Sequence, residues 1–176
     1  MNLICRFFGH IKTLITHKHY VFIHCCKAGI PWRGIVHDLS KFTPTEFIPG
    51  VRYYTGTKSP NEGERAANGF SLAWMHHKGR NKHHNEYWID FDMATKLPAP
   101  VKMPVKYVKE MYCDRLAACK TYYKKDYTDN DPLIYYNRKK DRRDFHPETA
   151  MLLQELLEML AQKGEKETFA YIRKLR

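Results

Sequence analysis

Residues 107–119 read Tyr-Val-Lys-Glu-Met-Tyr-Cys-Asp-Arg-Leu-Ala-Ala-Cys, and their apolar side chains recur at the spacing of one helix face. The apolar positions are Tyr107, Val108, Met111, Tyr112, Leu116 and Cys119. This pattern predicts a strongly periodic helix, and the same helix carries Asp114.

Similar helical patterns lie on both sides of this stretch. They predict further helices over residues 11–28, 32–39, 43 onward, 70–77 and 147–176, the last with a break at Gly164. Residues 56–69 are polar and turn-rich and are expected to form a long loop or lid, and residues 97–104 contain three prolines and suggest an irregular connector. No segment alternates polar and apolar residues for long enough to demand a sheet. We therefore predict an all-α fold in a single domain spanning residues 1–176.

The composition is that of a globular protein. The chain has 176 residues, of which 43 % are hydrophobic and 14 % aromatic, enough for one compact core. No apolar run approaches the roughly 20 residues that a membrane-spanning helix needs. The five cysteines are an odd number without a Cys-x-x-Cys pair, so neither a disulfide framework nor a zinc ribbon is indicated. We expect a cytoplasmic protein without a membrane partner.

The charge balance predicts an anionic partner. Lys and Arg number 30 against 19 Asp and Glu, which gives a formal charge of +11. We expect an anionic small molecule, a nucleotide above all. Nucleic acid stays an alternative, because residues 138–143 form a basic run that either attracts a polyanion or lies solvated at the surface. The leucine stripe of the last helix indicates either core packing or a homodimer face.

Histidines and carboxylates gather in four short clusters. They are His17-Lys-His19, His37-Asp38-Leu-Ser-Lys41, His76-His77-Lys-Gly-Arg80-Asn81-Lys-His83-His84-Asn-Glu86 and Asp114-Arg115. Imidazole nitrogens and carboxylate oxygens are both good ligands of borderline divalent cations. The clusters therefore predict one or two ions of Mn, Fe, Zn, Co, Ni or Mg.

Two physical points qualify this interpretation. Neighbours on a regular helix diverge by about 100°, so His37 and Asp38 can reach one ion only at a helix end or between helices. The third cluster also fits a basic strip that touches phosphates, because Lys78, Arg80 and Lys82 lie within it. The metal interpretation is favoured because the other clusters contribute carboxylates, which repel phosphate unless a cation lies between them.

The order of these residues resembles a known superfamily. His17 in a first helix, His37-Asp38 at the end of a second and Asp114 in a late helix resemble the HD-domain superfamily of metal-dependent phosphohydrolases, although Ser40 stands where many members have glycine. The chain is also similar, over nearly its whole length, to a little-characterised HD-like family of bacteria and phages, through the motifs His-Asp-Leu-Ser-Lys-Phe, Ala-Trp-Met-His-His, Arg-Asn-Lys-His-His-Asn-Glu-Tyr-Trp and His-Pro-Glu-Thr. The resemblance implies a helical bundle with a central metal site.

The resemblance also implies the ligands. It assigns His17, His37, Asp38 and Asp114 to a first metal, and His77 with His83 or His84 to a second. His19 remains the alternative to His17, and His76 is a neighbour without an assigned role.

Catalytic roles follow from the same resemblance. A divalent cation lowers the pKa of a bound water from 15.7 to about 7, which makes it a nucleophile for phosphorus near neutral pH. Asp38, Lys41 and Glu86 are the expected catalytic residues, with Glu46 as the alternative to Glu86 for orienting the water or a ligating histidine. The expected phosphate-binding residues are Lys41, Lys78, Arg80 and Asn81.

Two other functions stay open from the sequence. Some HD-type proteins with additional histidines are mixed-valent di-iron oxygenases, and a nucleotide- or nucleic-acid-binding protein could retain the metal site without turnover. The aromatic residues Trp74, Tyr87, Trp88, Phe91 and Tyr107 are placed to stack on a base, but core packing is the commoner role of aromatics at helical spacing.

Overall fold

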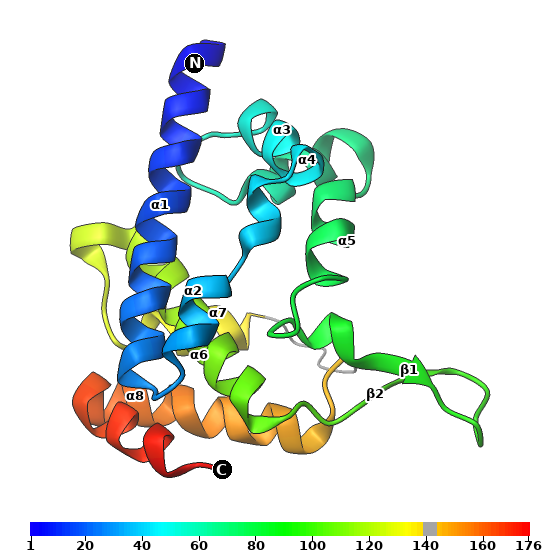
Figure 1. Cartoon of the computed structure of the whole chain (residues 1–176), viewed down its shortest axis with the longest axis vertical. Helices are drawn as coiled ribbons and strands as arrows, with labels where there is room; N and C mark the ends of the chain where they lie inside the picture. Colours follow the sequence, from blue (N-terminus) through cyan, green and yellow to red (C-terminus); the bar gives the residue numbers. More distant parts are fainter. Residues whose placement is uncertain (139–143) are drawn as a thin grey trace.

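The computed structural model describes residues 1–138 and 144–176, which fold mainly into helices (Figure 1). The α-helices are α1 (Leu3–Lys27), α2 (Pro31–Val36), α3 (Pro44–Arg52), α4 (Pro60–Asn68), α5 (Leu72–Lys78), α6 (Val105–Tyr123), α7 (Asp131–Asn137) and α8 (Pro147–Lys174). Short 3-10 helices lie between these elements, at Leu39–Phe42, Asn85–Trp88 and Lys124–Asp126. The all-α prediction is confirmed. In the described residues, no helix is long and apolar enough to cross a bilayer.

The core forms around α6, which packs against α1 and α8. Its apolar face meets Val21 and Cys25 of α1, and leucines of α8 close the other side. The buried leucines of α8 are Leu153, Leu156, Leu157 and Leu160. The periodic helix predicted for residues 107–119 is therefore the centre of the fold, with one additional turn near its C-terminal end. Figure 1 shows α8 running across the foot of α1 and α6.

Helix α1 is longer than its predicted range of 11–28. It begins at Leu3, where the Asn2 side chain accepts a hydrogen bond from the Cys5 amide at 2.9 Å. The first turn extends beyond the rest of the molecule (Figure 1), so Leu3 and Ile4 stay 70 % and 68 % exposed. Burial does not select side chains there, which explains why the amphipathic pattern becomes visible only from residue 11.

The predicted lid at residues 56–69 is wrong for most of its length, because residues 60–68 form α4. Pro60 occupies the first turn, where its missing amide hydrogen costs nothing, and the helix ends at Gly69. The buried carboxylate of Glu64 accepts hydrogen bonds from the Ser71 hydroxyl at 2.6 Å and the Ala73 amide at 3.3 Å. This contact ties α4 to the start of α5. The segment is polar because most of α4 faces solvent.

The predicted connector at residues 97–104 is only partly irregular. Residues Pro98–Pro100 form β2, which pairs antiparallel with β1 (Ile89–Phe91), and the hairpin projects from the helices (Figure 1). The predicted break at Gly164 is confirmed, because its φ of 75° is left-handed and interrupts α8.

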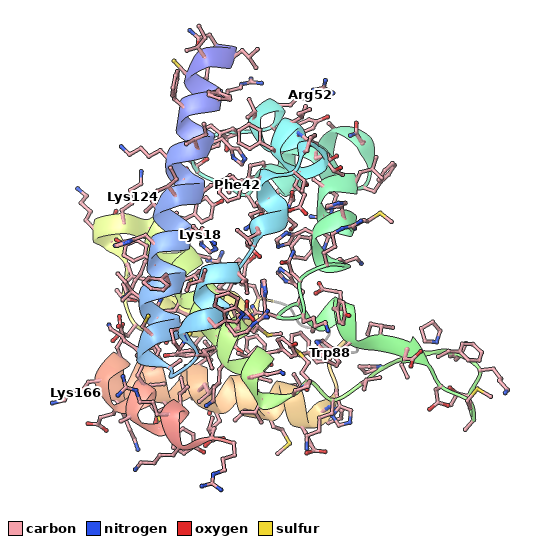
Figure 2. All side chains as sticks on the ribbon, viewed as in Figure 1. Lys18, Phe42, Arg52, Trp88, Lys124 and Lys166 are labelled. Carbon is pink, nitrogen blue, oxygen red and sulfur yellow. The ribbon has the colours of Figure 1, made fainter. Side chains whose placement is uncertain are left out.

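The second helix ends earlier than predicted, at Val36 rather than Leu39. Lys18 of α1 (labelled in Figure 2) donates from its Nζ atom to the carbonyl oxygens of Ile35 at 2.8 Å and His37 at 2.9 Å. These carbonyls lie at the end of α2, where no further helical turn pairs them. The lysine thereby fixes the turn at His37 and Asp38 against α1.

Gly34 allows α2 to approach α1 closely. A Cβ atom on Gly34 would lie 2.9 Å from the Cα of Phe22 and 2.9 Å from the Cβ of Cys25. The backbone of α1 cannot move aside without shifting the core.

Replacing Gly34 with Ala is therefore expected to lower the free energy of unfolding by about 1–3 kcal/mol, the usual cost of overpacking. Urea unfolding measures this change. An alanine variant as stable as the wild type would show that the two helices separate without cost.

Two further histidines, His10 and His24, are buried between aromatic rings. His10 lies between the rings of Phe47 and Tyr54, and His24 lies between those of Tyr20 and Phe169. Burial lowers the pKa of His24 to about 4; the Lys120 and Lys27 charges act in the same direction and the Glu165 charge opposes them.

Acid is expected to weaken the fold through His24. Between its ordinary pKa of 6.5 and its folded value of about 4, the unfolded chain binds a proton here that the folded chain does not. This stabilisation is present above pH 6.5 and is lost as the pH falls, by about 2 kcal/mol at pH 5. His24→Phe keeps the packing and removes the titration, so urea unfolding at pH 7.5 and pH 5 should show a smaller loss in the variant. Equal losses in the two proteins would contradict this origin.

Candidate metal centre

Four regions of the chain bring histidines and carboxylates to one point. His17 comes from α1, His37 and Asp38 from the turn after α2, and Asp114 from α6. The remaining members come from α5 and the segment after it, and they are His77, His83 and His84. All seven side chains that the sequence predicts as metal ligands meet here. Within each of the two groups described below, the candidate ligand atoms lie within 4.8 Å of one another.

The first group consists of His17, His37, Asp38 and Asp114. The Nε2 atom of His17 lies 3.0 Å from Oδ1 of Asp114. The Nε2 atom of His37 lies 3.4 Å from the same oxygen and 3.3 Å from Oδ2 of Asp38. Two imidazoles and two carboxylates therefore point their ligand atoms into one small volume, the donor set that a borderline divalent cation takes.

The second group consists of Asp38, His77, His83 and His84. The Nε2 atoms of His77 and His83 each lie 3.4 Å from Oδ1 of Asp38. Asp38 thus belongs to both groups, with Oδ2 facing the first and Oδ1 facing the second. A carboxylate in this position is suited to bridge two cations.

The backbone explains how His37 and Asp38 reach the same point. Helix α2 ends at Val36, His37 is extended with ψ of 129°, and Asp38 is left-handed with φ of 53°. Adjacent side chains that would diverge on a helix therefore converge. A positive φ is uncommon for a residue other than glycine, although aspartate tolerates it better than most, and such residues concentrate at functional sites.

Several buried atoms of the cluster lack a hydrogen-bond partner among the described residues. They include Nε2 of His17, His37, His83 and His84 and Oδ1 of Asp38, whereas Oδ2 of Asp38 pairs with Lys41. Unpaired buried polar atoms are costly and rare in native proteins. Their distances of 3.0–3.4 Å to one another without hydrogen-bond alignment fit lone pairs directed at a shared cation. The residues present fit a metal on this evidence.

The charge states of Asp38, Asp114 and His84 support the same fit. Burial alone would raise the pKa of Asp38, but the neighbouring His37, His77 and Lys41 hold it well below its usual range. Asp114 behaves alike, because His17 and His37 outweigh its burial and hold its pKa low. Both carboxylates are therefore ionised, the form that binds a cation. Burial also holds the pKa of His84 well below its usual value, which keeps this imidazole neutral.

Two glutamates orient the ligand histidines from behind. Glu46 of α3 contacts Nδ1 of His77 at 2.8 Å and Nδ1 of His76 at 2.6 Å. The sequence includes Glu46 as an alternative for this role. Glu110 of α6 contacts Nδ1 of His37 at 3.0 Å and was missed, because a glutamate on a helix is usually solvated. Its position one turn before Asp114 is the signal that identifies it, since residues four apart share a helix face.

Of the predicted catalytic and phosphate-binding residues outside the ligand set, Lys41 and Asn81 contact the cluster. Lys41 pairs with Oδ2 of Asp38 at 2.6 Å, and this contact outweighs burial and raises the lysine pKa. Asn81 donates to the Ser40 hydroxyl at 2.8 Å beside His77. Arg80 is exposed, with a long contact to the His76 carbonyl at 3.4 Å, and Lys78 is half-buried at the end of α5.

Glu86 and the alternative ligand His19 have no described contact with the cluster. Glu86 is half-buried in the 3-10 segment Asn85–Trp88, and the carboxylates that contact the cluster within the described chain are Glu46 and Glu110 instead. His19 is exposed on α1, whereas His17 is buried in the cluster. The geometry therefore favours His17 over His19 and brings His83 and His84 both into the second group.

The aromatic residues divide between the site and the core. The ring centroid of Trp74 lies 4.9 Å from that of His84 and 5.7 Å from that of His77. Trp88 packs on Tyr107 at 5.6 Å beside the core, at the base of the hairpin (Figure 2). The basic run at 138–143 falls almost wholly outside the described residues.

Comparison with known proteins gives one match. The model of a family of unknown function, DUF5662, matches residues 6–159, which include all the side chains of both groups. No curated protein and no solved structure matches the chain.

Proposed function

The chain belongs to the DUF5662 family, whose function is unknown, and we propose that it is a metal-dependent phosphohydrolase with an HD-type helical bundle and a dinuclear site. The observation that carries the proposal is the position of Asp38. Its two oxygens face two separate groups of histidines; Oδ1 has no hydrogen bond within the described residues, and Oδ2 pairs with Lys41. The convergence of His17, His37-Asp38 and Asp114 supports the HD-type order.

Phosphate-ester hydrolysis at this site requires residues that hold the divalent ions and a positive group that binds the phosphoryl oxygens. Bound divalent ions supply charge neutralisation for a phosphoryl group and acidify a water. His17, His37 and Asp114 hold the first ion, His77, His83 and His84 hold the second, and Asp38 holds both. Lys41 lies 2.6 Å from Asp38, so its ammonium group is placed to bind a phosphoryl oxygen at the edge of the site.

The substrate is a phosphate ester, with a nucleotide as the first candidate. The net charge of +11 favours an anion, and the basic residues Lys78 and Arg80 follow the ligand His77 closely in the sequence. Trp74, next to His84, provides an aromatic surface for a base.

The test combines metal analysis with phosphate release. Purified protein is expected to bind up to two equivalents of a divalent transition metal or Mg²⁺, and to release phosphate from a panel of nucleoside phosphates and p-nitrophenyl phosphate. His17→Ala should lose the first ion and the activity, while the exposed His19→Ala should keep both. Protein that binds no metal, or metal-loaded protein that releases no phosphate, would overturn the proposal. Iron with oxygen consumption and no phosphate release would favour the oxygenase instead.

A further inference from the structure

We propose that Glu110 is a positioning residue that aligns one histidine of each metal position and so couples the two positions. The inference rests on the proposed dinuclear site. It concerns how the chain orients the histidines that bind metal, and it does not depend on the reaction that the site catalyses.

Glu110 lies completely buried on α6, where an unpaired carboxylate would be costly. Its Oε2 atom accepts a hydrogen bond from Nε of Arg33 at 2.6 Å. Its Oε1 atom lies 3.0 Å from Nδ1 of His37 and 3.4 Å from Nδ1 of His83. The first contact is a hydrogen bond, and the second is a close approach to the same oxygen.

His37 and His83 belong to different groups of the site. With their Nδ1 atoms turned to Glu110, both rings present Nε2 to Asp38, at 3.3 Å for His37 and 3.4 Å for His83. A proton held on Nδ1 toward a carboxylate leaves the Nε2 lone pair for a cation. One buried oxygen thus sets the orientation of a ligand at each metal position, and the two ring centroids lie only 4.4 Å apart.

A carboxylate is required by the donors around it. Nε of Arg33 faces one oxygen, and the two Nδ1 atoms face the other. Glutamine has the same shape, but its NH₂ group must face either Nε of Arg33 or the two histidine Nδ1 atoms, and either choice places one N–H donor against another. Glu110→Gln therefore disturbs the alignment with little change in volume.

Glu46 provides a matched control. It contacts Nδ1 of His77 in the second group and Nδ1 of His76, which belongs to neither group. Glu46→Gln makes the same chemical change behind one metal position. The coupling role distinguishes the two glutamates, because only Glu110 serves both positions.

The experiment titrates metal-free protein with Mn²⁺ by calorimetry and with Co²⁺ by visible absorption. Glu110→Gln should weaken both equivalents by about 10–100-fold, the usual cost of removing a partner behind a ligand, and should change the Co²⁺ spectrum of each. Glu46→Gln should weaken one equivalent and leave the other within about threefold. Circular dichroism and urea unfolding of the metal-free variants check folding.

Arg33→Met is the second variant, for the case in which Glu110→Gln does not fold. It removes the donor to Oε2, keeps apolar contact with the Tyr107 ring and should weaken both equivalents in the same direction. The inference is overturned if these variants bind two ions as tightly as the wild type, if only one equivalent weakens, or if the wild type binds none. Wild-type protein that binds two ions but hydrolyses no phosphate ester overturns the proposed function and leaves the coupling to be decided by the titration.

Discussion

Asp38→Asn is expected to eliminate tight binding of both metals and to reduce phosphate release by on the order of a thousandfold, which corresponds to about 4 kcal/mol of transition-state stabilisation. The reason is that Asp38 is the one side chain shared by the two groups. The amide carries no charge, and its NH₂ group meets either the ligand histidines or the Lys41 ammonium, which lies 2.6 Å from Oδ2. Isothermal titration with Mn²⁺ and a phosphate-release assay measure the two effects.

Asparagine is chosen so that backbone strain at position 38 does not contribute to the measured effect. Asp38 has φ of 53°, and asparagine tolerates that conformation, whereas alanine would add strain of its own. Glu155→Gln makes the same carboxylate-to-amide change on the exposed side of α8, far along the chain from both groups, and should leave metal binding and activity unchanged. An Asp38→Asn protein that still binds two ions at wild-type affinity would show that Asp38 does not bridge them.

The fold was predictable where burial selects side chains. The apolar face of residues 107–119 and the leucines of α8 point to a core, and both segments form the core. The start of α1 and the whole of α4 were missed, because their residues face solvent and no apolar stripe marks them. Exposed helices depend on propensity and capping, which are weaker signals than hydrophobic periodicity.

The candidate metal ligands were predictable from the sequence because histidine is a rare residue type and the histidines cluster. The histidine clusters, the His37-Asp38 pair and Asp114 provide the seven candidate ligands that the resemblance to HD-domain proteins implies, and the structure brings all seven together. The residues behind them are common helix residues, so Glu110 and Arg33 carry no local signal of their own. Their roles depend on burial and on contacts 73 and 77 positions apart in the chain, which only the folded structure supplies.

The free energy of unfolding is expected to rise by about 4 kcal/mol when metal is added to 1,000 times its dissociation constant. A ligand that binds only the folded chain stabilises it by this amount through mass action. The folded chain holds the ligands together from α1, the turn after α2, the region of α5 and α6, whereas the unfolded chain separates them. Without a cation the same side chains lower the stability of the fold, because buried atoms such as Nε2 of His37, Nε2 of His84 and Oδ1 of Asp38 lack a hydrogen bond within the described chain.

Thermal unfolding with EDTA and with excess Mn²⁺ measures this linkage. For a chain of this size, about 4 kcal/mol corresponds to a rise in Tm of roughly 10 °C. Asp38→Asn should unfold at nearly the same temperature under both conditions, since it removes the ligand that both positions share. A wild-type Tm that does not respond to Mn²⁺, Zn²⁺, Co²⁺, Fe²⁺ or Mg²⁺ would mean that the buried histidines and carboxylates stabilise the fold without metal.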